Sequence, residues 1–323
     1  MREFHSIDKL RRTLLSLALG SVLMPSQAQA ATRLIVPAAA GGATDLLSRL
    51  YAQYLSDESP RPVIAENRPG AGGVIGTQLV AKAPADGSVL LMGALSHVVN
   101  SALMDNVPYD PLKDFTPIAK LLSFGSVLVV NPSVPVSDMK QFIAYAKLNP
   151  NKLIWALGAT GTSQQLAGVL LAREAGIQFV TVPYKGGGPA MNDLLGGHAS
   201  FMIESIPSAV PHIQSGRVRA LAVTGGQRSS GLPDVPTIGE AALPGFNVES
   251  WFALLGPAGL PNEVVQSTYQ RLQKIMARPA TLEKLVGMGA RPELLSPVET
   301  RAFMESESRR WVPIIKEANI RAN

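Results

Sequence analysis

The stretch VPAAAGG at residues 36–42 recurs in outline as VPYKGGG at residues 182–188. In both places an apolar run leads into a glycine loop, and a helical pattern follows the loop. This order predicts a strand, a tight loop and a helix N-terminus, where unpaired backbone N–H groups and the helix dipole favour an anion. Two such loops indicate a small anionic ligand held between two parts of the chain.

Outward from these loops, short apolar runs alternate with helical patterns along the chain. The expected strands cover residues 33–37, 62–66, 88–92, 126–130, 153–155, 180–182, 200–203, 218–223 and 251–255. Alternation of this kind predicts an α/β fold with parallel sheets covered by helices. The last helix is expected to start at Ser296, where Pro297 and Glu299 complete a capping box with proline at the first helical position.

The series of strand–helix units restarts after residue 130, which indicates two lobes. We expect lobe 1 to comprise residues 31–127 and 252–323, and lobe 2 residues 128–251. Extended crossings near residues 126–131 and 248–256 would form a hinge, although two rigid lobes would give the same pattern. Loops at the carboxyl ends of parallel strands bind ligands in such sheets, so glycine loops of both lobes should line a cleft.

Residues 1–30 are predicted to be a secretory signal peptide. Basic residues precede the apolar run 14–24, and Ala28-Gln29-Ala30 supplies small residues for cleavage after Ala30. The run is too short to span a bilayer, and a short membrane anchor is the alternative. Loss of this segment removes four basic and two acidic residues, which lowers the formal charge from +5 to +3. The mature protein is expected outside the cytoplasm.

Composition argues against several function classes. The basic residues are scattered without an aromatic-interleaved patch, so nucleic acid is not an expected partner. The chain contains no cysteine, which excludes disulfides, thiolate catalysis and cysteine-based metal sites. His97, His198 and His212 lack metal-ligand spacing, and no Gly-x-Ser-x-Gly elbow is present. The sequence therefore predicts no catalytic residue and no metal; His97 follows a strand and could face the cleft or belong to the core or surface.

The sequence contains two more glycine loops, at residues 158–163 and 70–76. The loop 158–163 precedes a helix that Thr162 or Ser163 should cap and Gly176 should end, and it lacks the lysine of a phosphate-binding P-loop. The loop 70–76 has Ile75 where a dinucleotide fingerprint requires glycine, so it is interpreted as a tight turn. No nucleotide and no other cofactor is expected. Asp45 lies in a first helical turn, where it is either a ligand-site residue or only a helix-start residue.

Many ordered motifs resemble the periplasmic substrate-binding receptors of tripartite tricarboxylate transporters, also called Bug receptors, over essentially the whole mature chain. The motifs are residues 37–45, 66–73 with Gly76, 85–87, 113–117, 182–186, 216–222, 233–237 and 256–261.

The resemblance implies a two-lobed, type II periplasmic binding protein fold, or Venus flytrap, that closes on a small carboxylate. The ligand's carboxylate would be held by the backbone of two facing loops and by bridging water. The protein would be a monomer without a cofactor and would deliver its ligand to a membrane permease. Carried onto this sequence, the ligand-binding residues are Pro37, Ala38, Ala39, Ala40, Gly41, Gly42, Asp45, Ser96, His97, Gly161, Thr162, Ser163, Gln164, Tyr184, Lys185, Gly186 and Glu204.

Three departures from the family pattern bear on the ligand. Gln165 stands where the family usually has histidine, and Ala38 and Ala40 stand where bulkier residues are common. Glu204 replaces the usual aspartate; facing the ligand, it would favour an amino or other cationic group, and otherwise it is a solvated or strand-end acid. Two rival functions remain: a periplasmic enzyme with Glu204 or His97 as base, and a receptor that presents its ligand to a membrane sensor kinase.

Overall fold

The structure is a computed structural model that describes residues 31–317 and 320–321. The predicted signal peptide lies outside the described residues. Residues from Ala31 onward form one compact unit. Among the helices of this described part, none has the length and apolar character that a membrane span requires.

The elements follow the predicted alternation. The strands are β1 Thr32–Val36, β2 Val63–Asn67, β3 Val89–Gly93, β4 Phe115–Val130, β5 Ile154–Leu157, β6 Val180–Pro183, β7 Phe201–Ser205, β8 Arg219–Val223, β9 Glu249–Pro257 and β10 Arg291–Leu295. The helices are α2 Ala43–Asp57, the 3-10 helix η1 Ala71–Gly73, α3 Val74–Ala81, α4 Leu95–Leu103, α5 Met139–Leu148, α6 Ser163–Ala175, α7 Gly187–Leu195, α8 Ile206–Gln214, α9 Ile238–Ala241, α10 Asn262–Met276, α11 Pro279–Gly287 and α12 Pro297–Glu317.

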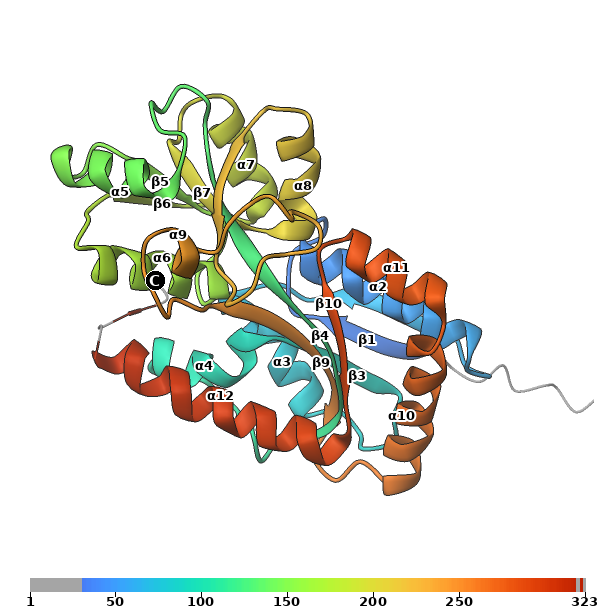
Figure 1. The fold of residues 1–323 in the computed structure, drawn as a ribbon. Helices are drawn as coiled ribbons and strands as arrows, with labels where there is room; N and C mark the ends of the chain where they lie inside the picture. Colours follow the sequence, from blue (N-terminus) through green and yellow to red (C-terminus); the bar gives the residue numbers. More distant parts are fainter. Residues whose placement is uncertain (1–30, 318–319, 322–323) are drawn as a thin grey trace, which may run out of the picture. The chain divides into compact units, whose positions relative to one another are not determined.

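The strands form one continuous path in the order β2-β1-β3-β9-β4-β7-β5-β6, with β8 and β10 also paired to β4. The outer strands pair in parallel, β1 with β2 and β3, and β5 with β6 and β7. The pairings made by β4 and β9 are antiparallel. The predicted parallel pairing is therefore found in the outer strands. The two long strands in the middle, β4 and β9, run antiparallel to their neighbours (Figure 1).

Strand β4 passes from one part of the sheet to the other. It pairs with β9 up to Gly125 and with β7 from Ser126 onward. The return passage lies at Val248, whose N–H donates to the Thr224 carbonyl (2.7 Å) just before β9 begins. We use lobe 1 for the part with β1–β3, β9 and β10, and lobe 2 for the part with β5–β8; the predicted boundaries after residues 127 and 251 stay a proposal.

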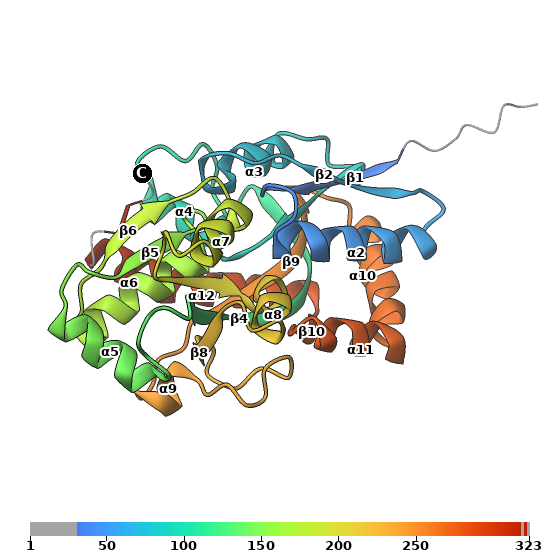
Figure 2. The ribbon, with the colours of Figure 1, turned by 90° about the horizontal axis from the view of Figure 1, so that it is seen from above.

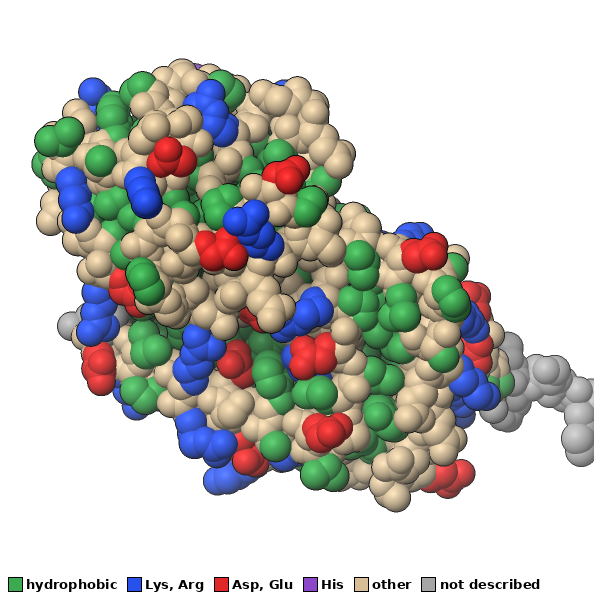
Figure 3. Space-filling model, in the orientation of Figure 1, with side chains coloured by type: hydrophobic (Ala, Val, Ile, Leu, Met, Phe, Trp, Pro, Cys, Tyr) green, Lys and Arg blue, Asp and Glu red, His purple; other side chains and the backbone are tan. Residues whose placement is uncertain are grey.

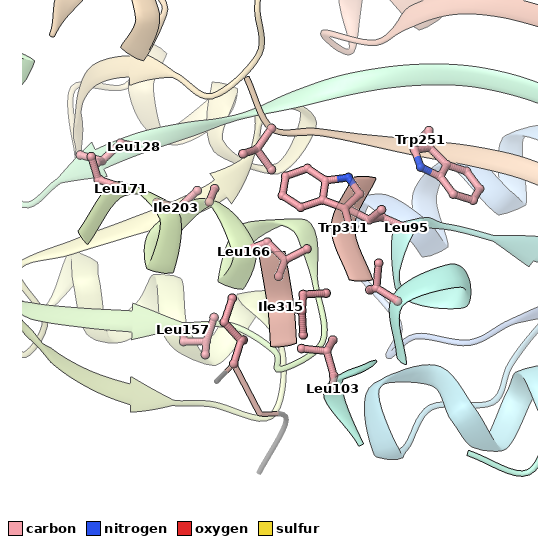
Figure 4. Close-up of a cluster of buried hydrophobic side chains, with 14 of the residues drawn as sticks. Leu95, Leu103, Leu128, Leu157, Leu166, Leu171, Ile203, Trp251, Trp311 and Ile315 are labelled. Carbon is pink, nitrogen blue, oxygen red and sulfur yellow. The ribbon is translucent and has the colours of Figure 1, made fainter. Parts of the chain in front are cut away.

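Among the described residues, three hydrophobic clusters form the core. On lobe 1, α2, α10 and α11 lie together beside the sheet and share one cluster with β4 (Figure 2). The largest cluster contains residues of both lobes, including Leu95 and Leu166, with Trp311 and Ile315 of α12 between them (Figure 4). Each fully buried side chain of this size contributes about 1.5–3 kcal/mol. Helix α12 therefore packs on lobe 2 as well as on lobe 1.

Candidate ligand site

The first glycine loop connects β1 to α2 and is held by Asp45. Gly41 has φ 87°, and its N–H donates to Asp45 Oδ2 (2.9 Å). Asp45 Oδ1 accepts a bond from Asn67 Nδ2 (2.9 Å) and pairs with Arg49 Nε (2.9 Å). Burial acts to raise the pKa of Asp45, but these bonds outweigh it and hold the pKa below its usual value. Asp45 thus shapes the loop, and its carboxylate is occupied by protein groups.

The backbone of this loop borders open space. A Cβ added at Gly41 or Gly42 would meet no atom within 4 Å. No side chain caps α2 at Gly42. The N–H groups of Ala43 and Thr44, in the first turn, lack intrahelical acceptors. These donors can bind an oxyanion, as the sequence predicts.

The loop before α6 has the same construction. Gly161 has φ 73°, and its N–H donates to Gln165 Oε1 (2.7 Å). Thr162 caps the helix, accepting the Gln165 N–H (3.4 Å), and Gly176 ends it, both as predicted. Gly161 and Gln165 therefore correspond to Gly41 and Asp45: in each loop the third helical residue binds the N–H of a left-handed glycine four positions earlier.

The glycine loop 70–76 lies between these two loops. A Cβ added at Gly73 would lie 3.1 Å from the Pro37 carbonyl oxygen, and one at Gly72 would lie 3.6 Å from that of Thr160. Asn100 Nδ2 donates to the Gly72 carbonyl (3.1 Å). A Cβ at Gly161 would lie 3.2 Å from Asn100 Oδ1. The interpretation of this loop as a mere turn was incomplete, because its glycines let the loops before α2 and α6 approach each other.

The loop before α7, the second copy of the opening pattern, is tied to the loop before α6. The Gly186 N–H donates to the Gly158 carbonyl (2.7 Å). The Tyr184 hydroxyl donates to Asp193 Oδ2 (2.6 Å), and Lys185 is exposed. Hydrogen bonding thus directs the Tyr184 hydroxyl towards α7 of its own lobe.

Glu204, at β7, is a buried acid at the start of α7. It is 8% exposed, and its Oε1 accepts the backbone N–H (2.8 Å) and hydroxyl (2.7 Å) of Ser205. A Cβ at Gly187 would lie 2.7 Å from Glu204 Oε2, so this carboxylate oxygen lies against the first residue of α7. Burial raises the pKa of Glu204, and the Ser205 bonds offset this only in part. The structure rules out a solvated acid.

The His97 ring lies in the core of lobe 1. It is 2% exposed, stacks on Tyr109 (centroids 5.9 Å apart) and meets Phe115 edge-on (4.5 Å). Its Nε2 lies 2.8 Å from the Pro111 carbonyl oxygen. Burial lowers the pKa of His97 to about 4, so the ring is neutral. The core alternative is correct for His97, while Ser96 beside it is half-buried in the first turn of α4.

Metal-binding clusters and cavities are the other features of the described residues that could form a site. Within the described residues no cluster of His, Asp and Glu could hold a metal ion. A cavity of about 330 Å³ lies between α4 and the C-terminal residues; its lining includes Met104, which also lies against Gly72, and Arg321, which also contacts Gln165. On the face seen in Figure 3, basic and acidic side chains are interspersed.

An α/β fold whose two lobes share strands, with helix N-termini at the ends of parallel strands, is typical of solute-binding proteins. The chain belongs to the tripartite tricarboxylate transporter family receptors, whose family model matches residues 47–320. The fold is the two-lobed fold of periplasmic solute-binding proteins of this type.

Relatives and solved structures cover nearly the whole chain. Protein BugT of Bordetella pertussis is 37% identical over 88% of both chains. An R. palustris protein solved with adipate has a TM-score of 0.86 at 34% identity, covering 90% of this chain and 98% of its own. MatC of Rhodopseudomonas palustris, solved with bound malate, has a TM-score of 0.81 at 31% identity, covering 89% and 99%.

Proposed function

We propose that this chain is a periplasmic receptor that binds a small organic carboxylate between the loops 37–42 and 161–164 and delivers it to a tripartite tricarboxylate-type permease. The observation that carries the proposal is the matched pair of loops, each with a clamped glycine and free N–H groups at a helix start. Solved relatives with adipate and malate support the ligand class. We infer a monomer whose first 30 residues are removed on export.

Backbone donors account for affinity without a cofactor. Each net hydrogen bond contributes about 0.5–1.5 kcal/mol, and bonds to a charged carboxylate about 1.5–3 kcal/mol. Closure of the two lobes would remove water from the site and strengthen each bond. The close approach of Gly161 to Asn100, whose side chain donates to the Gly72 carbonyl, is one of the contacts between the lobes.

The enzyme alternative loses one of its two candidate bases. His97 is buried among aromatic rings and has no open side. Glu204 is left, and its hydroxyl neighbours Ser205 and Ser208 are engaged with one another (3.0 Å). A sensor-kinase partner would use the same ligand site, so it differs from the permease proposal only in what the loaded receptor contacts.

Ligand binding is tested with the mature protein in a thermal-shift and calorimetry screen. Mono-, di- and tricarboxylates and acidic amino acids are the probes. A ligand at 100 times its dissociation constant should add about 2.7 kcal/mol to the free energy of unfolding. Absence of a shift with every probe would contradict the proposal, and turnover of a bound probe, followed by mass spectrometry, would favour the enzyme.

Glu204→Gln tests whether Glu204 faces the ligand, which would favour a ligand with an amino or other cationic group. A ligand with an ammonium group should lose about tenfold or more in affinity, because the variant removes its counter-charge, whereas a dicarboxylate should bind equally or better. The raised pKa means that the folded state binds more protons than the unfolded state, so Glu204 lowers stability as pH rises above its unfolded pKa.

The variant should therefore gain stability over the wild type at pH 7 relative to pH 4. Denaturant unfolding at both pH values measures this difference. The exposed Glu283→Gln change is the matched control, because it removes a carboxylate from the surface of the protein. An equal response of the two variants would show that Glu204 is not held as a buried acid.

A further inference from the structure

Gln165 uses both ends of its amide inside the protein. The side chain is buried, with 8% exposed. Its Oε1 accepts the Gly161 N–H (2.7 Å), and its Nε2 donates to the Arg321 carbonyl (3.3 Å). A glutamine is suited to this position because one planar group supplies an acceptor and a donor at once.

The contact with Arg321 crosses between the lobes. Residues 320 and 321 are anchored to lobe 1: the Ile320 N–H donates to the Ile315 carbonyl (3.0 Å) of α12, and Arg321 pairs with Asp105 (2.8 Å) after α4. Gln165 lies in the first turn of α6, in lobe 2. The amide therefore joins the ligand loop of lobe 2 to the C-terminal residues.

The equivalent residue in the other loop is charged, and its charge is balanced. Asp45 has Arg49 Nε at 2.9 Å and Asn67 Nδ2 at 2.9 Å. Among the described residues no cation contacts the Gln165 side chain. An acid at position 165 would add a buried, unbalanced negative charge beside the free N–H groups of α6, which are the donors available to an anion.

We propose that Gln165 is a positioning residue of the ligand site: it fixes the start of α6 through Gly161 without adding charge and couples this loop to the C-terminal residues through Arg321. The inference rests on the proposed carboxylate-binding function. It assigns the two loops different electrostatic roles. The side chain that holds the glycine is the charged and balanced Asp45 in one loop and the neutral Gln165 in the other.

Three variants of the mature protein separate these effects, with the carboxylate that gives the largest stabilisation as the probe. Gln165→Met keeps the volume and removes both bonds; we expect about a tenfold loss of affinity. Gln165→Glu keeps an acceptor for the Gly161 N–H but adds charge. Its affinity should fall at least as far at pH 7 and recover as the pH approaches the ordinary glutamate pKa of about 4.3. Gln165→His, with one acceptor and one donor nitrogen, should restore most of the affinity.

The NMR resonance of the Gly161 amide reports on the hydrogen bond to Gln165 directly, without any ligand. Loss of its acceptor in Gln165→Met should shift this resonance and speed its hydrogen exchange, while Gln165→Glu should keep both close to wild type. Gln266→Met, on the exposed side of α10, is the matched control and should change neither affinity nor the resonance.

Affinity within twofold of wild type for both Gln165→Met and Gln165→Glu, in a protein that binds the probe, overturns the inference and leaves the proposed function intact. Failure of the wild type to bind any carboxylate overturns the proposed function and this inference with it.

Discussion

Replacement of Gly168 by alanine should destabilise the protein by about 3 kcal/mol, the upper end of the range for overpacked cores. The added Cβ would lie 2.8 Å from Trp155 Cζ3 and closer still to two other atoms of the indole ring. Trp155 is 1% exposed, and Phe179 (5.4 Å) and Phe201 (6.2 Å) pack against it. The ring has no space into which it can retreat, so α6 must move away from β5.

Urea unfolding measures this effect. Gly287→Ala, in α11, is the matched control because its added Cβ would meet no atom within 4 Å. In that helix the change should be neutral or stabilising by up to about 1 kcal/mol. A free energy of unfolding for Gly168→Ala within about 0.5 kcal/mol of wild type, which is the range of neutral surface changes, would show that the ring and helix adjust.

The sequence predicted the ends of helices correctly where the interacting residues are close together in the chain. The start of α12 is an example: Ser296 donates its N–H to Glu299 Oε2 (2.8 Å), and Glu299 donates to Ser296 Oγ (3.3 Å), as the capping box requires. Both partners lie within one helical turn. The same reason explains the correct cap at Thr162 and the correct end at Gly176.

The length of β4 was not predicted, because its partners are distant in sequence. Only residues 126–130 were expected, but the strand starts at Phe115. Pro117 and Lys120 interrupt its apolar run. Lys120 is nevertheless buried, and its ammonium pairs with Glu293 of β10 and lies over the Phe303 ring (4.4 Å). No local pattern shows that a lysine has such partners.

The site was predicted as a set of loops, and the relations between them were not. The order of strand, glycine and helix predicted an anion site at residues 36–42, because this order is local, whereas the loop 161–164 entered the predicted site only through the family resemblance. The roles of Asp45 and Gln165 depend on side-chain direction, which the sequence leaves open. The loop 70–76 was underestimated because the close approach of Gly72 to Thr160 joins segments of different lobes.

Asp45→Ala should cause the largest loss of ligand affinity, about 100-fold, and lower stability by about 2–3 kcal/mol, since it leaves charge-assisted bonds unmade in a buried site. Gly41 loses the acceptor that holds its left-handed conformation, and Arg49 loses its carboxylate partner. The loop then has no fixed direction for its N–H groups. Calorimetric titration and urea unfolding measure the two effects.

The stability lost in Asp45→Ala should depend on pH. The pKa of Asp45 is lowered in the folded state, so its contribution to stability is full above the unfolded pKa of about 3.9 and is lost as pH falls through the folded value. The stability difference between wild type and Asp45→Ala should therefore shrink in acid. Asp57→Ala, at the exposed end of the same helix, is the matched control and should cause no loss of affinity. Among the described residues, Asp45 is the side chain that accepts the Gly41 N–H. If Asp45→Ala binds the ligand as tightly as wild type does, binding of the ligand's carboxylate does not depend on this hydrogen bond.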